Sequence, residues 1–272
     1  MKPKLKAWFV RLGRALPGLK KQTLSVAKGT LGVLAPCALL LLAMYMLNTL
    51  CQVKAWPAGA KTLLRLLESV AVTPVTAGMI TYAAGASWES RGASLIDAVH
   101  LARIRIKEIV LTGVVAGLTV LAADWIASMI YSLIGLIPAL LGWIPLVGPV
   151  ITAIASSVIW LLSLAMEFIA HAALVMGMLS LTADGLSGRP QIERVLNILR
   201  SGHENLLQAL VLIFGLWIVA HGVYELAFWA LPVGSALICD ALVAAATALS
   251  MTAISVVYLK ERDRMDGMRF HV

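Results

Sequence analysis

Long apolar runs separated by short polar stretches divide this chain of 272 residues. A helix that crosses the hydrocarbon core of a membrane needs about 20 mainly apolar residues. Glycines and prolines, such as Pro138, Pro145 and Pro232, separate runs that would otherwise be too long for one helix. The pattern predicts six spans in an all-α, polytopic membrane protein, at about 30–50, 69–87, 109–135, 150–180, 206–229 and 236–258.

Two of the polar segments, 88–108 and 184–205, have a helical periodicity of their own. Each carries apolar residues at i, i+3, i+4 and i+7 after a turn rich in Gly and Ser, and Ser94 and Pro190 suit helix starts. We therefore expect two amphipathic helices at the cytoplasmic membrane interface. The two segments align, so the unit of span, interfacial helix and span predicts an internal repeat. The aligned pairs are Leu95/Ile192, Ala98/Val195, Val99/Leu196, Ala102/Leu199 and Arg103/Arg200.

Basic residues predict the topology and the domain limits. The first 28 residues carry eight lysines and arginines and no acid. The apolar run that follows reaches Val53, which favours a retained first span over a cleaved signal peptide. The loops 136–149 and 230–235 contain no basic residue, whereas the amphipathic segments and the tail do. We therefore expect both termini in the cytoplasm, although Lys54, Lys61 and Arg65 in the first outer loop run against this. The predicted parts are a basic amphipathic segment at 1–28, a transmembrane domain at 29–258 and a cytoplasmic tail at 259–272.

The composition agrees with this class and narrows the partners. The chain is 60% hydrophobic and 13% charged, whereas soluble domains average about 25% charged residues. Most of the net charge of +8 comes from the amino-terminal block, which predicts binding to anionic lipid headgroups. No interleaving of aromatic and basic residues points to a nucleic-acid partner. The expected location is the inner (cell) membrane of a bacterium.

Ionisable residues inside the predicted spans carry the candidate chemistry, because such groups are costly in hydrocarbon and mark pathways, proton relays or buried pairs. The six candidates are Asp124, Glu167, His171, His221, Glu225 and Asp240. Glu167/His171 and His221/Glu225 each share a helix face. In one interpretation Asp124, His221, Glu225 and Asp240 form an outer layer that binds a divalent cation or relays protons. In the other, Asp124, Glu225 and Asp240 reach interfacial water, and only the deeper Glu167, His171 and His221 need a functional explanation.

Small residues and cysteines add packing information. Gly113 and Gly117 form a GxxxG pattern, and the last span is rich in alanine, which predicts close helix packing within the bundle or, alternatively, a homodimer. Cys37, Cys51 and Cys239 lack metal or redox spacing; Cys51 and Cys239 are either buried thiols or a disulfide. HExxH, GxSxG and P-loop motifs do not occur, so we expect no hydrolytic zinc site and no cofactor.

The sequence from Tyr258 to Gly267 resembles the closing signature of a family of six-span prokaryotic membrane proteins. This family includes the YciC-like proteins and the membrane domain fused to some glycerophosphodiester phosphodiesterases. Its signature, Tyr-x-x-x-Arg-x-Arg-x-acid-Gly, is matched by Tyr258, Arg262, Arg264, Asp266 and Gly267. The chain departs from the family at Lys260-Glu261, where Asp-Leu is usual, and shows no phosphodiesterase domain. The resemblance implies the fold, the membrane location and a role in envelope homeostasis, and no catalytic residue.

The leading interpretation is a non-enzymatic integral membrane protein that supports envelope or membrane homeostasis through partner proteins. One alternative is a small transporter or channel whose path is lined by Glu167, His171, His221 and Glu225. A second alternative is an intramembrane enzyme that modifies lipids, which would require acid-base groups to converge at one interface.

Overall fold

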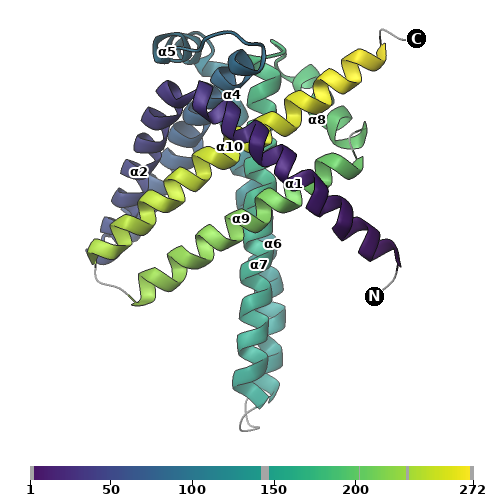
Figure 1. The fold of residues 1–272 in the computed structure, drawn as a ribbon. Coiled ribbons are helices and arrows are strands. Elements are labelled where there is room, and N and C mark those ends of the chain that lie inside the picture. The colour runs from purple at the N-terminus through teal and green to yellow at the C-terminus, as the bar shows by residue number, and fades with distance from the viewer. Residues whose placement is uncertain (1–2, 142–146, 202, 231–232, 270–272) are drawn as a thin grey trace. The chain divides into compact units, whose positions relative to one another are not determined.

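The computed structural model describes residues 3–141, 147–201, 203–230 and 233–269, and every element in them is a helix. The predicted all-α class is therefore confirmed. The elements are α1 (Pro3–Gly29), α2 (Leu31–Val53), α3 (Ala58–Leu67), the π-helix η1 (Glu68–Val72), α4 (Thr73–Trp88), α5 (Leu95–Ile104), α6 (Ile106–Leu141), α7 (Val147–Thr182), α8 (Arg189–Ser201), α9 (His203–Ala230) and α10 (Val233–Arg269). Figure 1 draws these helices as a ribbon.

Within the described residues, five stretches are long and apolar enough to cross a membrane, so the chain is a multi-pass membrane protein. They are Leu31–Val53, Ala58–Trp88, Pro149–Thr182, Leu206–Ala227 and Ala236–Gly267. The remaining predicted span, 109–135, lies within α6, which includes side chains outside the described set. The number six therefore stays a prediction.

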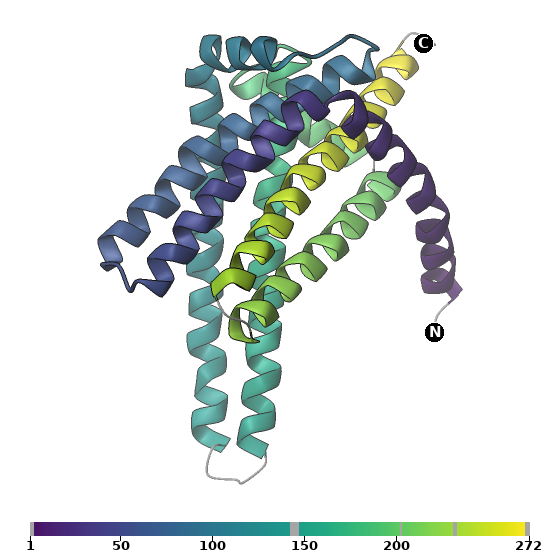
Figure 2. The same cartoon turned by 60° about the vertical axis from the view of Figure 1, so that its left-hand side comes forward.

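The chain forms two compact units, each described here by itself. The first contains residues 1–114 and 173–272, and the second contains residues 115–172. The second unit consists of parts of α6 and α7, which lie side by side in both ribbon views (Figures 1 and 2). All the contacts discussed below belong to the first unit.

Helix α10 is the central helix of the first unit. It packs against α9, α2, α4 and α1, and 78% of its apolar segment is buried, against 22–33% in the other four candidate spans. Tyr258, Met251 and Ile254 are fully buried, and Ala244 and Ala248 lie among neighbouring helices. The alanine-rich segment thus packs within the bundle, as one of the two interpretations predicted.

Two helices extend by about three turns beyond their predicted limits. The second span begins at 58 rather than 69, which places Lys61 and Arg65 on helix α3 and not in a loop. Helix α10 continues through the predicted tail to Arg269. No proline interrupts this stretch, and Arg264 and Glu261 form an i, i+3 ion pair at 2.9 Å that supports the extra turns.

A proline explains the π-helix between α3 and α4. Pro74 has no N–H, and its ring crowds the carbonyl four residues earlier, at Val70. The helix widens at this point, and the Thr73 N–H donates to the Glu68 carbonyl, five residues back. Helix α6 approaches this site through Gly113. A Cβ added at Gly113 would lie 2.2 Å from Pro74 Cγ and 3.3 Å from the Val70 carbonyl oxygen.

The two predicted amphipathic helices form as α5 and α8. Ser94 caps α5 by accepting a hydrogen bond from the Asp97 N–H at 3.1 Å, as predicted. Each helix buries one row of side chains, which includes Ala98 on α5 and Val195 on α8. Each also exposes an outer apolar row, Leu95, Ile96 and Val99 on α5 and Ile192, Leu196 and Leu199 on α8.

Candidate functional site

Asp240 is the most deeply buried of the predicted site residues. It lies two turns into α10, and its side chain is 0% exposed. One interpretation placed it in water at the interface. The structure corrects this, because α2 and α9 cover that face of α10. The carboxyl oxygen Oδ1 accepts a hydrogen bond from Thr49 Oγ1 of α2 at 3.1 Å. Within the described residues, no hydrogen bond reaches Oδ2.

A second hydroxyl extends this contact onto α9. Tyr224 Oη lies 3.3 Å from Thr49 Oγ1. Because Thr49 gives its only proton to Asp240, the remaining bond requires Tyr224 to donate to Thr49. The result is a chain of two hydroxyls, Tyr224 to Thr49 to Asp240, in which every donor points toward the carboxyl. We call these three residues the Asp240 chain.

Asn48, the residue before Thr49, binds a second carboxyl group. Asn48 Nδ2 donates to Glu68 Oε2 at 2.6 Å, and Glu68 is the first residue of the π-helix. Two neighbouring residues of α2 thus bind two carboxyl groups on different helices. Two turns further along α10, Tyr45 of α2 pairs with Thr247 at 3.3 Å. Helix α2 therefore provides a polar strip within an apolar bundle.

His221 and Glu225 lie on α9 with Tyr224. The half-buried His221 pairs through Nδ1 with the Trp217 carbonyl at 3.0 Å, and its ring lies 4.2 Å from the Trp217 ring, centroid to centroid. Glu225 is exposed. The expected i, i+4 relation holds by position, but the partner that His221 contacts is Trp217, one turn earlier.

The other three predicted site residues belong to the second unit. Glu167 is half-buried and His171 is buried, both on α7. The side chain of Asp124 on α6 lies outside the described residues. Of the six candidate residues, only Asp240, His221 and Glu225 therefore lie in the first unit. Neither His221 nor Glu225 belongs to the Asp240 chain.

The resemblance motif forms a second polar site at the C-terminal part of α10. Tyr258 is fully buried, and its hydroxyl donates to Asp184 Oδ2 at 2.6 Å. Arg194 of α8 donates to the same oxygen at 3.3 Å and to both oxygens of Asp266, at 3.1 and 2.9 Å. Asp184, Arg194, Tyr258, Arg262 and Asp266, with Glu89, are called the tail cluster.

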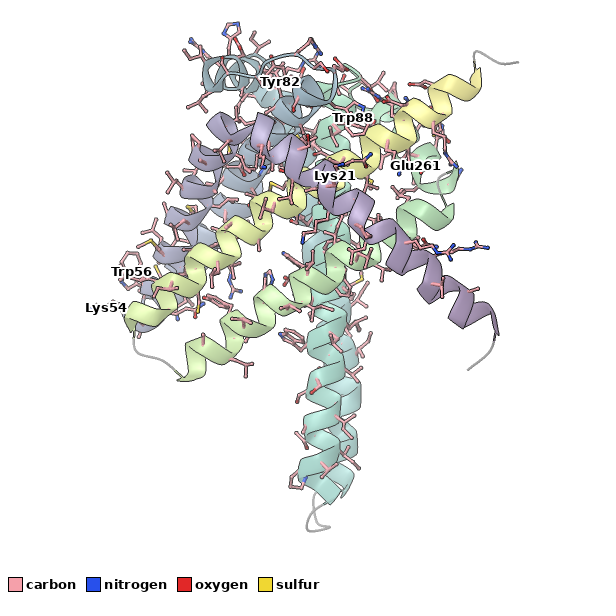
Figure 3. The ribbon with its side chains drawn as sticks, viewed as in Figure 1. Lys21, Lys54, Trp56, Tyr82, Trp88 and Glu261 are labelled. Carbon is pink, nitrogen blue, oxygen red and sulfur yellow. The ribbon has the colours of Figure 1, made fainter. Side chains whose placement is uncertain are left out.

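Arg262 connects both predicted loops to α10. Its Nη1 lies 3.5 Å from Asp184 Oδ1, in the loop after α7, and 3.6 Å from Glu89 Oε1, in the loop after α4. Its Nη2 pairs with Asp263 at 2.9 Å, and Asp263 also accepts the Trp88 indole N–H at 2.7 Å. In Figure 3, Trp88 and Glu261 lie along this end of α10, whereas Lys54 and Trp56 mark the opposite end of α2.

The centre of the tail cluster is shielded from water, whereas Asp266 and Glu89 at its edge are 40% and 34% exposed. The side chains of Arg262, Asp184 and Arg194 are 12%, 12% and 13% exposed. Burial disfavours the charge of Arg194, but its hydrogen bonds to Asp266 and the negative charge of Asp184 outweigh this and raise its pKa. The arginines thus stay charged and paired, and the cluster joins α4, the α7–α8 loop, α8 and α10.

The sequence pattern identified only part of these sites. Tyr258, Arg262 and Asp266 stood out as a motif, whereas Asp184 and Arg194 looked like ordinary loop and surface charges. Thr49, Tyr224 and Glu68 gave no signal, because hydroxyls are common in membrane helices and Glu68 lies beside the apparent start of a span. Their partners are up to 191 residues away, so sequence spacing does not reveal them.

The metal interpretation gains no support from the geometry. Among the residues searched, no group of three His, Cys, Asp or Glu side chains is placed to hold an ion. Cys37, Cys51 and Cys239 are buried free thiols, and for Cys51 and Cys239 this was one of the two interpretations. The hydroxyls around Asp240 suit proton transfer or hydrogen bonding better than metal binding.

Comparisons with family models, with curated proteins and with solved structures give no match to this chain.

Proposed function

We propose that this chain is a non-enzymatic integral protein of the bacterial cytoplasmic membrane that supports envelope homeostasis by presenting its interfacial helices to partner proteins. The observation that carries the proposal is the tail cluster. Its arginines and carboxylates pair with one another at 2.9–3.5 Å, instead of surrounding a site for substrate. Such a cluster holds α8 in a fixed position on the bundle.

The outer rows of α5 and α8 supply the surface for this role. Ile96 is 80% exposed and Ile192 is 55% exposed, while the opposite face of each helix packs on the bundle. An amphipathic helix of this kind lies in the headgroup region or binds an apolar partner surface. Fixing it by buried ion pairs keeps that surface in place.

The proposal includes the six-span topology with both termini in the cytoplasm, the internal repeat and membership in the YciC-like family. The repeat is supported by the placement of Glu89 and Asp184, which follow α4 and α7 and both approach Arg262.

The topology is tested by treating single cysteines at the exposed Lys54 and Arg91 with a membrane-impermeant maleimide. We expect labelling of intact cells at Lys54→Cys only; labelling at Arg91→Cys in intact cells would contradict the orientation.

Complementation tests the function. A strain without the gene is challenged with detergent and osmotic stress and supplied with variants at equal expression. Wild type and Glu225→Gln, which changes an exposed acid, should restore growth. Arg262→Gln should fail, because it releases the cluster. Normal growth of the deletion strain under these stresses, or lipid turnover by the purified protein, would overturn the proposal.

A small transporter is the second candidate, and the buried Asp240 favours it. Carboxyls in such positions are common in proton and ion pathways. The two functions separate in the same strain, because Asp240→Asn should abolish growth rescue by a proton-coupled transporter and leave a scaffold active.

A further inference from the structure

We propose that Asp240 is a proton-binding site: its carboxyl group carries a proton in the folded protein, and Thr49 and Tyr224 form the route by which that proton exchanges. The proposal goes beyond the homeostasis role and does not depend on it. It rests on three features of the Asp240 chain, namely complete burial, the direction of its hydrogen bonds and the unpartnered carboxyl oxygen.

The burial of Asp240 makes an ionised carboxylate at this position costly. Asp240 is 0% exposed within an apolar bundle, and an ionised carboxylate there requires a cation or several donors. In the described part of the chain, no Lys, Arg or His pairs with Asp240, and Oδ1 receives the hydrogen bond from Thr49. Neutral hydroxyl groups such as those of Thr49 and Tyr224 do not compensate for a full buried charge, so the carboxyl binds a proton.

The other titratable groups on the helices around Asp240 do not neutralise its charge in place of the proton. The nearest along these helices are Tyr45, Cys51, Lys54, His221, Glu225, Cys239 and Glu68. Five of these seven are neutral or acidic. Lys54 is exposed at the end of α2, and His221 contacts the Trp217 carbonyl instead. A divalent cation is also disfavoured, because it requires about six oxygen ligands, more than the Asp240 chain supplies.

The hydroxyls give the proton a route. Tyr224 is half-buried and lies six residues from the end of α9 at Ala230, which is about 9 Å along the helix. A proton that reaches the Tyr224 oxygen displaces the Tyr224 hydroxyl proton to Thr49, and the Thr49 proton moves to Asp240 Oδ1. Each hydroxyl ends with one proton and only the carboxyl gains one, so the transfer balances. In the protonated state Oδ1–H donates to Thr49, and both hydrogen bonds run in the reverse direction.

Infrared spectroscopy of the full-length protein in lipid nanodiscs tests the assignment. Carboxyl-13C aspartate separates aspartic acid bands from those of glutamic acid. At neutral pH, wild type should show the carbonyl band of a protonated aspartic acid, and Asp240→Asn should lose it. Asp124→Asn, which changes another aspartate in a predicted span, should retain the Asp240 component. A spectrum in which Asp240→Asn removes no protonated component overturns the site.

Hydrogen–deuterium exchange tests the route. Transfer into D2O shifts the band of the protonated acid, and Thr49→Val and Tyr224→Phe should each slow that shift at least severalfold while keeping the band. Unchanged exchange in both variants overturns the route. If Asp240→Asn does not fold, the labelled Asp124→Asn variant decides the matter, because its band cannot come from the other aspartate in a predicted span: without a protonated aspartic acid band at neutral pH, Asp240 is ionised.

Discussion

At Gly113, a single missing side chain allows α6 to approach α4. A Cβ there would lie 2.2 Å from Pro74 Cγ, and the proline ring cannot rotate away. Gly113→Ala should therefore destabilise the protein by about 1–3 kcal/mol, as overpacking does, and lower Tm in detergent. Gly215→Ala is the control, because Gly215 is exposed on α9 with no atom within 4 Å of the added Cβ. An equal loss in both variants would contradict the close approach.

Asp184 is the acceptor that three donors share, from Tyr258, Arg194 and Arg262. Asp184→Asn removes the negative charge and leaves two arginines, 12% and 13% exposed, with fewer counterions. Breaking a buried pair on one side costs about 3–5 kcal/mol, so we expect a large loss of stability in chemical unfolding.

The matched control for Asp184 is Glu193→Gln. Glu193 pairs with Arg189 at 2.7 Å, but both side chains are more than half exposed, and exposed pairs contribute about 0–1 kcal/mol. A loss for Asp184→Asn as small as that for Glu193→Gln would show that the tail cluster is not held together by these charges.

Residue identities were predictable from sequence where the constraint is local. The cap at Ser94 and the small residue at Gly113 were recognisable, because a cap and a close approach each require a particular residue type. The burial of Asp240 was not, because a proline and a glycine nearby suggested a turn in water. Whether an acid near a helix start faces water depends on the helices that cover it.

At the scale of helices, α5 depends on its first turn. Ser94 accepts the Asp97 N–H, and its hydroxyl also donates to the Asp97 carboxylate at 2.6 Å. Ser94→Ala should cost about 1 kcal/mol and speed hydrogen exchange of the first α5 amides. Ser94→Asn, which retains an acceptor, should restore protection; equal exchange in both variants would argue against the cap.

Helix positions followed from hydrophobic periodicity, and helix ends were less predictable. Apolar runs located α2, α7 and α9 to within a few residues. The hydrophobic pattern did not predict the start of α3 or the end of α10. Charged residues such as Arg65 and Lys260 end an apolar run without ending a helix. Helix length here is set by backbone hydrogen bonds and ion pairs, not by hydropathy alone.

At the scale of the whole chain, Arg262 connects segments distant in sequence, since it approaches Glu89 and Asp184. Arg262→Gln should increase hydrogen exchange in both loops, 89–94 and 183–188, at once. Arg264→Gln is the control, because Arg264 is 43% exposed and pairs with Glu261 on its own helix. Faster exchange in one loop only would contradict the shared contact.

Pairings of this length could not be predicted from the sequence. The motif around Arg262 and the two loops were each visible as patterns, but nothing in their spacing matched Asp184 to Tyr258, 74 positions away. The predicted all-helical membrane class holds for the described residues because composition and periodicity determine it. The partners of the polar groups depend on tertiary packing.

The π-helix at Glu68–Val72 has a consequence for how this chain tolerates changes in length. A π-turn holds one residue more than the α-helix that would replace it, so a one-residue deletion in 69–72 can be absorbed by converting the segment to α-helix. Five residues of a π-turn and four residues of an α-helix subtend nearly the same angle, so the residues on both sides of the deletion keep their orientation. With α4 held by its packing, Glu68 would stay beside Asn48, 2.6 Å away in the intact chain. We expect Ala71 deletion to keep the helical circular dichroism spectrum and to leave Asn48→Ala as costly for Tm as in the intact chain; a neutral Asn48→Ala in the deletion background would contradict this.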